Sequence, residues 1–546
     1  MKKALLALLC TLLCTNLTAQ NFSWAKSLSG LDADDARAMT LDNEGNVLVT
    51  GYFSDSIDAD PGAGVLNMAP QGGTYDFLIQ KLTPSGDLIW ARQISGTAEE
   101  YANAIITDAN GGIYLTGIFE DTVDFDPSVG TDTLISAGMN DIFILHLDSA
   151  GQFVWVKQIG GTENDYGFDV DVDAAGNIYV VGNFNSNAGI DFDPGPGVEM
   201  RFTALSNWDA FTLKLDSNGD FIWVKQTFGA VYDAGQSVEI DNSGNVYTVG
   251  AVATRVFVQK LAPDATNIWL RDFGALDFNT VQNNKGKLDP FGNLFISGTF
   301  SNTVDFDSGV AVHQLVPQNR DIYTVKMDTA NNVIWAKRVG GPQDDYSLSL
   351  DVDAAGNIYN YGNFNGTADF DPGVNTYDLT SATNLDFFLQ KLDNSGDFLW
   401  AGQFGQSTYY TNGQIVADDA GAVYATGSFS GVVDFDPGAG VFNMSSTLTT
   451  GDRDIFILKL FFPAGVSEVS NTDNHCTVYP NPSGGPVNII SQENIDKLEV
   501  KDVLGKRIYI AKPGKKETTF TIETPGIYFI TVSSANKVQT EKLIVQ

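Results

Sequence analysis

The stretch DIFILHLDSAGQFVWVKQIGGTENDYGFDVDVDAAGNIYVVGNF occupies residues 141–184, and it returns as DIYTVKMDTANNVIWAKRVGGPQDDYSLSLDVDAAGNIYNYGNF at residues 321–364. Each copy alternates runs of β-branched and aromatic residues with short segments of Asp, Gly and Asn. This is the pattern of strands joined by tight turns. In one repeat the runs fall at residues 168–173, 177–184, 209–215 and 221–226. The repeat is therefore predicted to hold four strands, named first to fourth in that order.

A tryptophan marks the fourth strand of every repeat. The intervals between these tryptophans are 66, 65, 68, 46, 66 and 65 residues: Trp24, Trp90, Trp155, Trp223, Trp269, Trp335 and Trp400. A fixed period with four strands per unit is typical of a β-propeller, whose units pack their faces on one another around an axis. The indoles are predicted to be structural anchors and not a sugar-stacking platform. We expect an all-β, seven-bladed β-propeller over residues 21–462.

The two ends of the repeat region complement each other. The first tryptophan strand, residues 22–28, has no first strand before it. The last third strand, residues 454–460, has no fourth strand after it. The amino-terminal strand is therefore predicted to complete the seventh blade and close the ring, which removes open sheet edges.

The interval of 46 residues shows where the repeat varies. Its second strand, residues 245–251, and its third strand, residues 255–261, survive, but the segment between them is almost absent. The segment that joins the second and third strands is therefore an inserted loop in the other repeats. Because these loops vary in length and sequence, we expect the ligand to bind on the face that carries them.

An Asp-x-Asp phrase recurs in the inserted loop of six repeats: Asp58/Asp60, Asp124/Asp126, Asp191/Asp193, Asp305/Asp307, Asp369/Asp371 and Asp434/Asp436. The blade topology places these loops on one face with a set of acidic residues: Asp34, Asp35, Glu99, Glu100, Asp165, Asp233, Asp277, Asp344 and Asp345. Closely spaced carboxylates suit Ca²⁺. Asp before Pro-Gly also orders turns through bonds from its side chain to the backbone. The structural turn is the favoured interpretation; calcium stays open, and no other cofactor is expected.

The sequence contains no recognisable catalytic constellation. His146 occupies the position that lysine fills in the other repeats: Lys81, Lys214, Lys260, Lys326, Lys391 and Lys459. His313 falls in a loop, and His475 and Cys476 follow the last repeat. Six similar Asp pairs leave no unique pair for glycoside chemistry. The protein is predicted not to be an enzyme. Trp208, outside the tryptophan register, is the candidate for an exposed aromatic.

Charge and the amino terminus restrict the location and partners. The chain has 67 acidic and 31 basic residues, a formal charge of -36, so nucleic-acid binding is not expected. Residues 1–19 read as a signal peptide, with Lys2 and Lys3 before an apolar run and a small-residue cleavage region. No later run approaches the roughly 18 apolar residues of a membrane-spanning helix. We expect a soluble protein, secreted or on the outer cell surface.

The composition changes after the repeats. A linker, residues 463–476, leads to residues 477–546, which hold nine basic and seven acidic residues against twenty and fifty-eight in residues 21–462. Strand-like runs at residues 486–490, 497–502, 507–511, 517–523, 526–533 and 538–545 predict a small β-sandwich.

Two family resemblances follow from these motifs. GNIYVVGNF, DAFTLKLDSNGDFIW and GGTENDYG resemble the bacterial SBBP-type seven-bladed β-propeller repeats, which are known chiefly as scaffolds. YPNP, VKDVLGKRIY, PGIYFITV and the terminal EKLIVQ resemble the carboxyl-terminal sorting domain of the type IX secretion system of Bacteroidetes. This resemblance implies export through the type IX machinery, removal of residues 477–546, and surface attachment or release. An accessory adhesive sandwich is the alternative.

These observations predict a binding or adhesion module, secreted or on the cell surface, with an unknown surface ligand, either a glycan or a protein. Two alternatives stay open. One is a polysaccharide-active enzyme on the same scaffold, and the other is a structural protein of the cell envelope.

Overall fold

The computed structural model describes most of the chain: residues 20–30, 32–72, 75–203, 207–227, 232–253, 255–274, 284–307, 312–382, 385–407, 413–447, 453–462, 476–479, 486–491, 493–502, 507–522, 524, 526–534 and 537–545. Strands and no helix form within these ranges, so the all-β prediction is confirmed there. The predicted leader, the linker up to His475, and Asp277 lie outside the described residues. Contacts divide the chain into two compact units, Met1–Pro463 and Ala464–Gln546.

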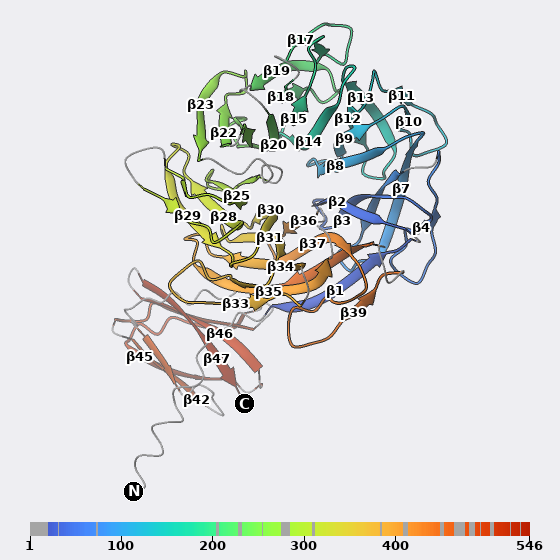
Figure 1. Cartoon of the computed structure of the whole chain (residues 1–546). Helices are drawn as coiled ribbons and strands as arrows, with labels where there is room; N and C mark the ends of the chain where they lie inside the picture. Colours follow the sequence, from blue (N-terminus) through green and yellow to red (C-terminus); the bar gives the residue numbers. More distant parts are fainter. Residues whose placement is uncertain are drawn as a thin grey trace. The chain divides into compact units, whose positions relative to one another are not determined.

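The first unit contains seven sheets with the same order of four antiparallel strands in the described residues (Figure 1). The first strands are β2 (Asp34–Leu41), β8 (Glu100–Thr107), β14 (Asp165–Val172), β20 (Asp233–Ile240), β24 (Lys285–Leu288), β30 (Tyr346–Val352) and β36 (Gln414–Ala417). The second strands are β3 (Val47–Phe53), β9 (Ile113–Phe119), β15 (Ile178–Phe184), β21 (Val246–Val252), β25 (Leu294–Phe300), β31 (Ile358–Phe364) and β37 (Ala422–Phe429). Sheets 1 to 7 are numbered in this order.

The outer half of each sheet comes from the third and fourth strands. The third strands are β6 (Asp76–Leu82), β12 (Asp141–Leu147), β18 (Asp209–Leu215), β22 (Arg255–Leu261), β28 (Asp321–Met327), β34 (Leu385–Leu392) and β40 (Asp454–Phe461). The fourth strands are β7 (Leu88–Gly96), β13 (Phe153–Ile159), β19 (Phe221–Thr227), β23 (Asn267–Phe273), β29 (Val333–Val339), β35 (Phe398–Ser407) and, for sheet 7, β1 (Asn21–Leu28).

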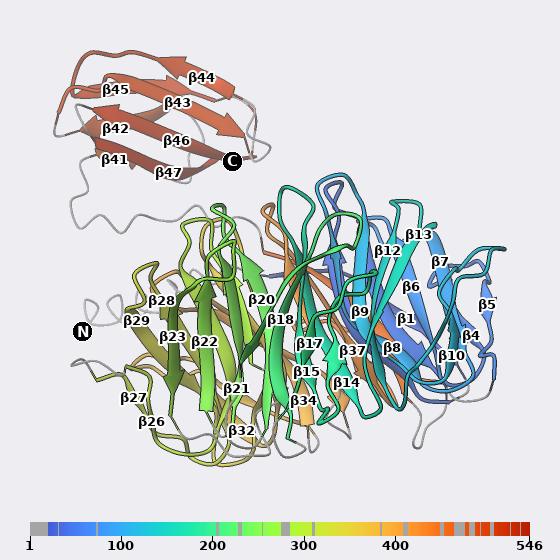
Figure 2. The same ribbon diagram turned by 90° about the horizontal axis from the view of Figure 1, so that it is seen from above.

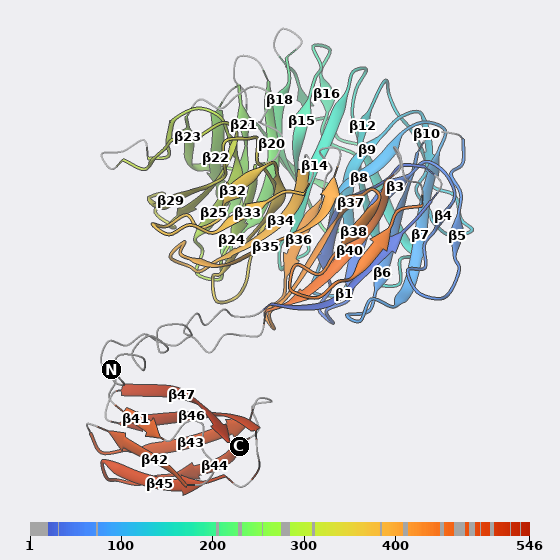
Figure 3. The ribbon, with the colours of Figure 1, turned by 60° about the horizontal axis from the view of Figure 1, so that its bottom comes forward.

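The amino-terminal strand lies in the last sheet. β1 pairs antiparallel with β40, from Asn21 opposite Phe461 to Leu28 opposite Ile455 (Figure 3). The first strands also contact one another from sheet to sheet, and β2 of sheet 1 contacts both β8 and β36. The strand pairing expected between the two ends of the repeat region is therefore present.

Six sheets carry a short hairpin between their second and third strands. The hairpin strands are β4 (Ile57–Asp58), β5 (Asn67–Met68), β10 (Thr122–Asp124), β11 (Thr133–Ile135), β16 (Ile190–Asp191), β17 (Met200–Arg201), β26 (Val304–Asp305), β27 (Gln314–Leu315), β32 (Thr367–Asp369), β33 (Asp378–Thr380), β38 (Val432–Asp434) and β39 (Asn443–Ser445). Several of them lie along the lower side of the unit in Figure 2. Sheet 4 has no such hairpin among its described residues, as its short interval predicts.

Hairpins also fasten neighbouring sheets together. β10 of sheet 2 pairs with β7 of sheet 1, where Val123 lies opposite Gly96. Equivalent bridges join Ser29 to Asp58 and Gly340 to Asp369. In these three places the inserted loop therefore binds the end of the fourth strand of the preceding sheet, or the residue that follows it.

The hydrophobic core lies between sheets. In the cluster between sheets 1 and 2, the Phe77 ring of β6 stacks on the Phe143 ring of β12 with 5.5 Å between centroids. β6 and β9 are buried along their whole length, because each sheet packs a neighbour on both faces. Each fully buried Leu, Ile or Phe contributes about 1.5–3 kcal/mol. This explains why the runs are apolar without strict alternation.

Three of the seven regularly spaced tryptophans form hydrogen bonds that join a fourth strand to the next sheet. The indole N–H groups of Trp24, Trp223 and Trp335 donate to the carbonyls of Pro84, Pro263 and Asn394 at 3.2, 3.0 and 3.3 Å. These carbonyls lie in turns between third and fourth strands. Gly86 occupies one such turn with a φ of 82°, and an added Cβ would lie 3.2 Å from the Trp24 ring.

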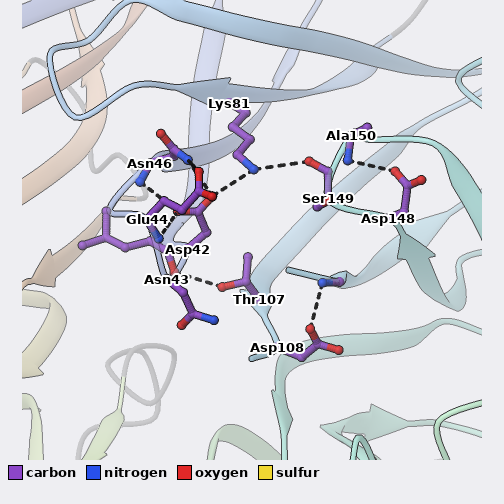
Figure 4. Close-up of polar contacts among 12 residues, drawn as sticks. Asp42, Asn43, Glu44, Asn46, Lys81, Thr107, Asp108, Asp148, Ser149 and Ala150 are labelled. Carbon is purple, nitrogen blue, oxygen red and sulfur yellow. Dashed lines mark hydrogen bonds and ion pairs between the residues drawn. The ribbon is translucent and has the colours of Figure 1, made fainter. Parts of the chain in front are cut away.

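A second junction forms where the first strand turns into the second (Figure 4). The Asp42 Oδ1 atom accepts the backbone N–H groups of Glu44 and Asn46, both at 2.9 Å. Lys81 Nζ lies 2.9 Å from Asp42 Oδ2 and donates to the Ser149 carbonyl of sheet 2 at 3.2 Å. The turn between the first and second strands, which Asp42 holds in place, is thus also a contact between sheets.

The second unit has two antiparallel sheets in its described residues. One contains β41 (Cys476–Tyr479), β42 (Pro486–Ser491) and β45 (Glu517–Thr521). The other contains β43 (Lys497–Asp502), β44 (Arg507–Ala511), β46 (Gly526–Ser534) and β47 (Lys537–Val545). Val487 and Phe520 of the first sheet share a buried cluster with Leu498 and Ile530 of the second.

Candidate functional site

A cavity of about 460 Å³ lies where the first strands of the seven sheets meet. Sheets 1 to 6 each supply at least one lining side chain from the first strand or its start, and Gly413 precedes β36 of sheet 7. Its volume is within the ~300–1,000 Å³ of small-molecule sites. We call it the axial cavity.

Irregularities in five first strands direct side chains into the axial cavity. The ladder between first and second strands skips one residue in sheets 1, 2, 3, 4 and 6. The skipped residues are Arg37, Asn103, Phe168, Gln236 and Leu348, and all five line the cavity. A β-bulge re-aims a side chain in this way, often beside a binding site. These residues were not predicted from the sequence. The signal that could have identified them is a position in the first strand at which these five repeats each carry a different residue.

Aromatic side chains form an arc along one wall. The Tyr166 ring lies 5.9 Å from Phe168 and 5.3 Å from Trp208, and Trp208 lies 6.2 Å from Tyr232. All four line the cavity. Trp208, the predicted exposed aromatic, is half-buried and belongs to this wall. The loops after the second strands emerge on the same face, because Tyr166 pairs with Asn183 near the end of β15.

Arg37 lies between two aromatic rings. Its guanidinium carbon is 4.1 Å from the centroid of Tyr101 and 5.1 Å from that of Tyr52. Asp35 is engaged elsewhere, because it accepts a hydrogen bond from the Tyr52 hydroxyl at 2.6 Å and pairs with Arg453 at 2.8 Å. Burial raises the pKa of the Tyr101 phenol, so this hydroxyl stays protonated at neutral pH.

A second, smaller cavity of about 100 Å³ adjoins the axial cavity, since Lys285 lines both. Here Lys287 Nζ lies 2.8 Å from Glu239 Oε1, with Asp171 and Asp351 nearby. Burial, followed by the charge of Glu239, raises the pKa of Asp171 to about 7. Three carboxyl groups therefore surround one ammonium group at this depth.

The first Asp of each predicted pair lies at the end of a hairpin and binds backbone. Asp369 Oδ1 accepts the N–H groups of Asp371 and Tyr377 at 3.0 and 2.9 Å. The first Asp makes the same two bonds in the other five hairpins: Asp58, Asp124, Asp191, Asp305 and Asp434. These bonds from the Asp side chain to the backbone are the ones that the turn interpretation predicts.

The second Asp of each pair also bonds within the protein. In five hairpins its Oδ1 atom accepts the N–H group of the residue two positions later, at 2.8 Å or, for Asp126, 2.9 Å: Asp60, Asp126, Asp193, Asp371 and Asp436. In the hairpin of sheet 5, Asp307 pairs with Arg271 Nη2 at 2.8 Å. The second carboxylates therefore continue the turn that the first ones begin.

The structure does not gather these carboxylates into a calcium cluster. Among the described residues, no group of three His, Cys, Asp or Glu side chains is placed to hold a metal ion. The twelve residues considered as calcium ligands from the sequence thus remain six separate pairs: Asp58 and Asp60, Asp124 and Asp126, Asp191 and Asp193, Asp305 and Asp307, Asp369 and Asp371, and Asp434 and Asp436. The physical reason is that the carboxylate oxygen atoms named above accept backbone N–H groups of their own hairpin or, for Asp307, pair with Arg271.

The residue between the two Asp is the buried one. Phe370 is fully buried, with its ring 5.2 Å from Phe364 and 4.8 Å from Phe388. The same position holds a buried phenylalanine in four other hairpins and Ala59 in sheet 1: Phe125, Phe192, Phe306 and Phe435. The phrase is therefore a hydrophobic plug between two turn-forming carboxylates.

Six of the acidic residues expected on the same face as the inserted loops lie on that face, because the ladders place them opposite the ends of second strands, but their side chains are buried: Asp34, Asp35, Glu100, Asp165, Asp233 and Asp345. They lie at the starts of first strands. Burial, followed by the neighbouring Asp76, raises the pKa of Glu100 to about 10. Burial raises the pKa of Asp165 and of Asp345 to about 7. These six carboxyl groups therefore belong to the buried interior of the first unit, whereas the side chain of Glu99 is exposed.

His146 and His313 lie apart from the axial cavity. His146 stacks on Tyr114 at 4.2 Å between ring centroids, and burial lowers its pKa. His313 donates its backbone N–H to Asp305 Oδ1 at 2.9 Å in a hairpin.

The part of the chain that the structure describes holds no helix long and apolar enough to span a membrane.

Comparison with protein families identifies two segments. Residues 477–546 match the family of the secretion system C-terminal sorting domain, with the boundaries that the sequence predicts. This segment is a type IX sorting domain. Residues 154–187 match the β-propeller repeat family. The sorting domain indicates export by the type IX secretion system, to the cell surface or the medium, and thus a partner in its machinery.

Individual relatives are distant. The chain is 22% identical over 450 residues to an uncharacterized WD repeat-containing protein of Acanthamoeba polyphaga mimivirus, covering 75% of this chain and only 30% of that relative. PorZ, a surface component of the type IX secretion system of Porphyromonas gingivalis, is 11% identical, with a TM-score of 0.21 and coverage of 96% and 100%. An ulvan lyase is 8% identical, with a TM-score of 0.29 and coverage of 96% of both chains. The activities of such distant structures carry no argument for this chain.

Proposed function

We propose that the protein is a non-catalytic binding or adhesion module, secreted or held on the outer cell surface, and that its ligand enters the axial cavity. The observation that carries this proposal is the set of five bulge residues. The backbone repeats from sheet to sheet, but arginine, asparagine, phenylalanine, glutamine and leucine occupy the bulge. Such variation on a repeated scaffold is suited to recognition of one ligand.

The chemistry of the lining also favours binding. The titratable side chains among the described lining residues are Arg37, Lys285 and three tyrosines. Hydrolysis of a glycosidic bond ordinarily uses two carboxyl groups that flank the bond. Aromatic rings and amides are instead suited to holding a ligand in one orientation.

The scaffold that supports this function is, we infer, a seven-bladed β-propeller closed by the amino-terminal strand. The pairing of β1 with β40 and the contacts of β2 with both β8 and β36 support this inference. Closure matters for binding because the axial cavity takes residues from opposite sides of the ring.

A glycan array combined with a reducing-sugar assay tests the proposal. We expect retention of a ligand without release of sugar ends, and loss of retention in Tyr166→Ala and Trp208→Ala. Phe291→Ala, at an exposed aromatic outside the cavity lining, is the control and is expected to bind normally. Product formation would instead favour a polysaccharide-active enzyme. An abundant surface protein that retains no glycan or protein would favour the structural role in the envelope.

Export has its own test. Deletion of residues 477–546 is expected to leave the first unit in the periplasm, because the sorting domain is the part that the type IX machinery recognises. Cell fractionation and surface labelling measure this. Undiminished surface display of the shortened chain would contradict the assignment.

A further inference from the structure

The axial cavity gathers basic side chains in a strongly acidic protein. Elsewhere in the first unit, ion pairs with carboxylates are common, as in Lys81 with Asp42 and Arg271 with Asp307. Arg37 and Lys285 line the cavity and form no ion pair with a described residue. No carboxylate is among the described lining residues. Because charges in enclosed sites are normally paired, the cavity is suited to an anion.

Arg37 is held in place before any ligand arrives. The rings of Tyr52 and Tyr101 fix its guanidinium, and its Nε atom is buried without a hydrogen-bond acceptor among the described residues. The bulge between Ala36 and Ala38 sets the direction of its side chain. A planar guanidinium suits a carboxylate or sulfate, to which it donates two parallel hydrogen bonds.

Neutral polar groups complete the recognition surface. Asn183 is fully buried and lines the cavity, and neither its Oδ1 nor its Nδ2 atom has a hydrogen-bond partner among the described residues. Asn103 contributes a second amide, whose Nδ2 atom donates to the Gly167 carbonyl at 2.9 Å, so its Oδ1 atom is the one offered to a ligand. An amide both donates and accepts, which matches a ligand hydroxyl. The rings of Tyr166 and Trp208 offer flat apolar surface for the C–H face of a sugar ring.

The second cavity, beyond Lys285, limits how far an anion enters the axial cavity. Past Lys285, the side chains of Asp169, Asp171, Glu239 and Asp351 line the narrower cavity. Lys287 also lines this cavity, but it is paired with Glu239, and the four carboxyl groups outnumber it. They oppose deeper entry of negative charge, so the anionic group is expected to stop between Arg37 and Lys285. The site therefore suits a chain end better than the middle of a polymer.

We propose that the axial cavity binds the terminal residue of an acidic saccharide, a sugar that carries a carboxylate or a sulfate. This proposal rests on the binding function proposed above. The sugar ring packs on the aromatic wall, its hydroxyls bond to Asn103 and Asn183, and its anionic group pairs with Arg37 and Lys285.

Calorimetric titration of the full-length protein tests this class of ligand. The probes are a panel of uronic acid trisaccharides, sulfated trisaccharides, the neutral counterpart of each, and a triglutamate peptide. We expect at least one acidic sugar to bind about tenfold or more tighter than its neutral counterpart, with a preference that weakens as salt is raised. Comparison of the uronic and sulfated arms identifies the anion.

Variants separate the charge from the fold. Arg37→Gln is expected to remove most of the preference for the acidic sugar, and Arg37→Lys to keep part of it. Lys225→Gln is the matched control, because Lys225 lies in β19 outside the cavity lining. Melting temperatures of all variants establish that each is folded.

Each outcome decides the proposal. An acidic sugar bound no tighter than its neutral counterpart, or a preference unchanged in Arg37→Gln, overturns it and leaves the binding function standing. Binding of triglutamate without any sugar overturns it in favour of an acidic protein ligand. Absence of binding by every probe, together with an empty glycan array, overturns this inference and the glycan-binding function together.

Discussion

The junctions between sheets and the axial cavity use the same repeated backbone in opposite ways. At the junctions the same side chains return in sheet after sheet, as in the tryptophans that donate to the turn of the next sheet. In the cavity the same bulge returns with a different side chain each time. Repeated side chains therefore fix the geometry, and the non-repeated ones are free to specify a ligand.

This contrast predicts which substitutions change stability and which change binding. Changes at the junctions are expected to lower or raise the melting temperature, because they alter packing that every sheet shares. Changes at the bulges are expected to alter binding, because those side chains line an open space.

The largest effect is expected from removing residues 20–29, which deletes β1 from sheet 7. The deletion exposes the edge of β40 and removes the buried Leu28 and the Trp24 contact with the Pro84 turn. We expect a loss of about 5 kcal/mol or more in the free energy of unfolding, from lost burial and ladder bonds. Thermal melting measures it.

Deletion of residues 537–545 is the matched control, because β47 lies in the other unit and the transition of the first unit is expected to persist. A melting curve unchanged by loss of residues 20–29 would contradict the role of β1 in the ring.

A smaller loss of stability is expected from truncation of the buried phenylalanine between the two Asp residues of one hairpin. Phe370→Ala leaves a cavity beside Phe364 and Phe388, and such truncations cost about 3–5 kcal/mol. Phe168→Ala removes the same atoms from a half-buried bulge and is expected to cost about 1 kcal/mol or less while weakening ligand binding. Chemical denaturation of both variants measures the difference. Equal losses would remove the distinction between junction and cavity.

The scaffold is predictable from the sequence because the repeat averages out local ambiguity. Seven similar copies make the four-strand pattern visible, and strand ends fall close to their predicted positions, as for β18 at Asp209–Leu215. The unpaired strands at the two ends also predict the pairing of β1 with β40, because each end lacks what the other supplies.

The site is harder to predict, for a reason that Phe168 and Asp369 illustrate. A bulge is invisible in the apolar pattern of a strand, so Phe168 reads as an ordinary strand residue. The Asp-x-Asp phrase attracts attention through its charge, although Phe370 between the two carboxylates is the buried residue. Repetition marks structure, so the most repeated residues say least about a ligand.

The buried carboxyl group of Glu100 predicts a pH-dependent effect. Its pKa is about 10 in the folded chain, well above the ~4.3 of an exposed glutamate. Below about pH 4.3 both states are protonated, and as the pH rises toward 10 folding must take up a proton, so stability is progressively lost. Glu100→Gln removes this cost and is expected to stabilise the protein by up to about 5 kcal/mol at pH 8 and little at pH 4.

Melting curves from pH 4 to pH 9 test this pH dependence. Glu99→Gln changes the same residue type at the adjacent exposed position and is expected to leave the curves unchanged. A Glu100→Gln variant that is less stable than the parent at pH 8 would mean that the carboxylate is ionised in the folded chain and is needed there.

The smallest loss of stability is expected from substitution of a carboxylate in a hairpin turn. The same substitutions distinguish the turn interpretation of the Asp-x-Asp phrase from the calcium interpretation. Asp369 Oδ1 accepts two backbone N–H groups, and an asparagine side chain offers an oxygen in the same place. Asp369→Ala is therefore expected to cost about 1–2 kcal/mol, and Asp369→Asn well under 1.

In a calcium site, by contrast, the loss of the negative charge in Asp369→Asn removes binding energy, and a chelator lowers the melting temperature of the parent protein. Calcium titration by calorimetry, with melting curves in chelator, distinguishes the two. Because each hairpin uses the same carboxylate oxygen to hold its own backbone, we expect no heat and no shift; a chelator-sensitive melting temperature that Asp369→Asn weakens would assign the hairpins to calcium.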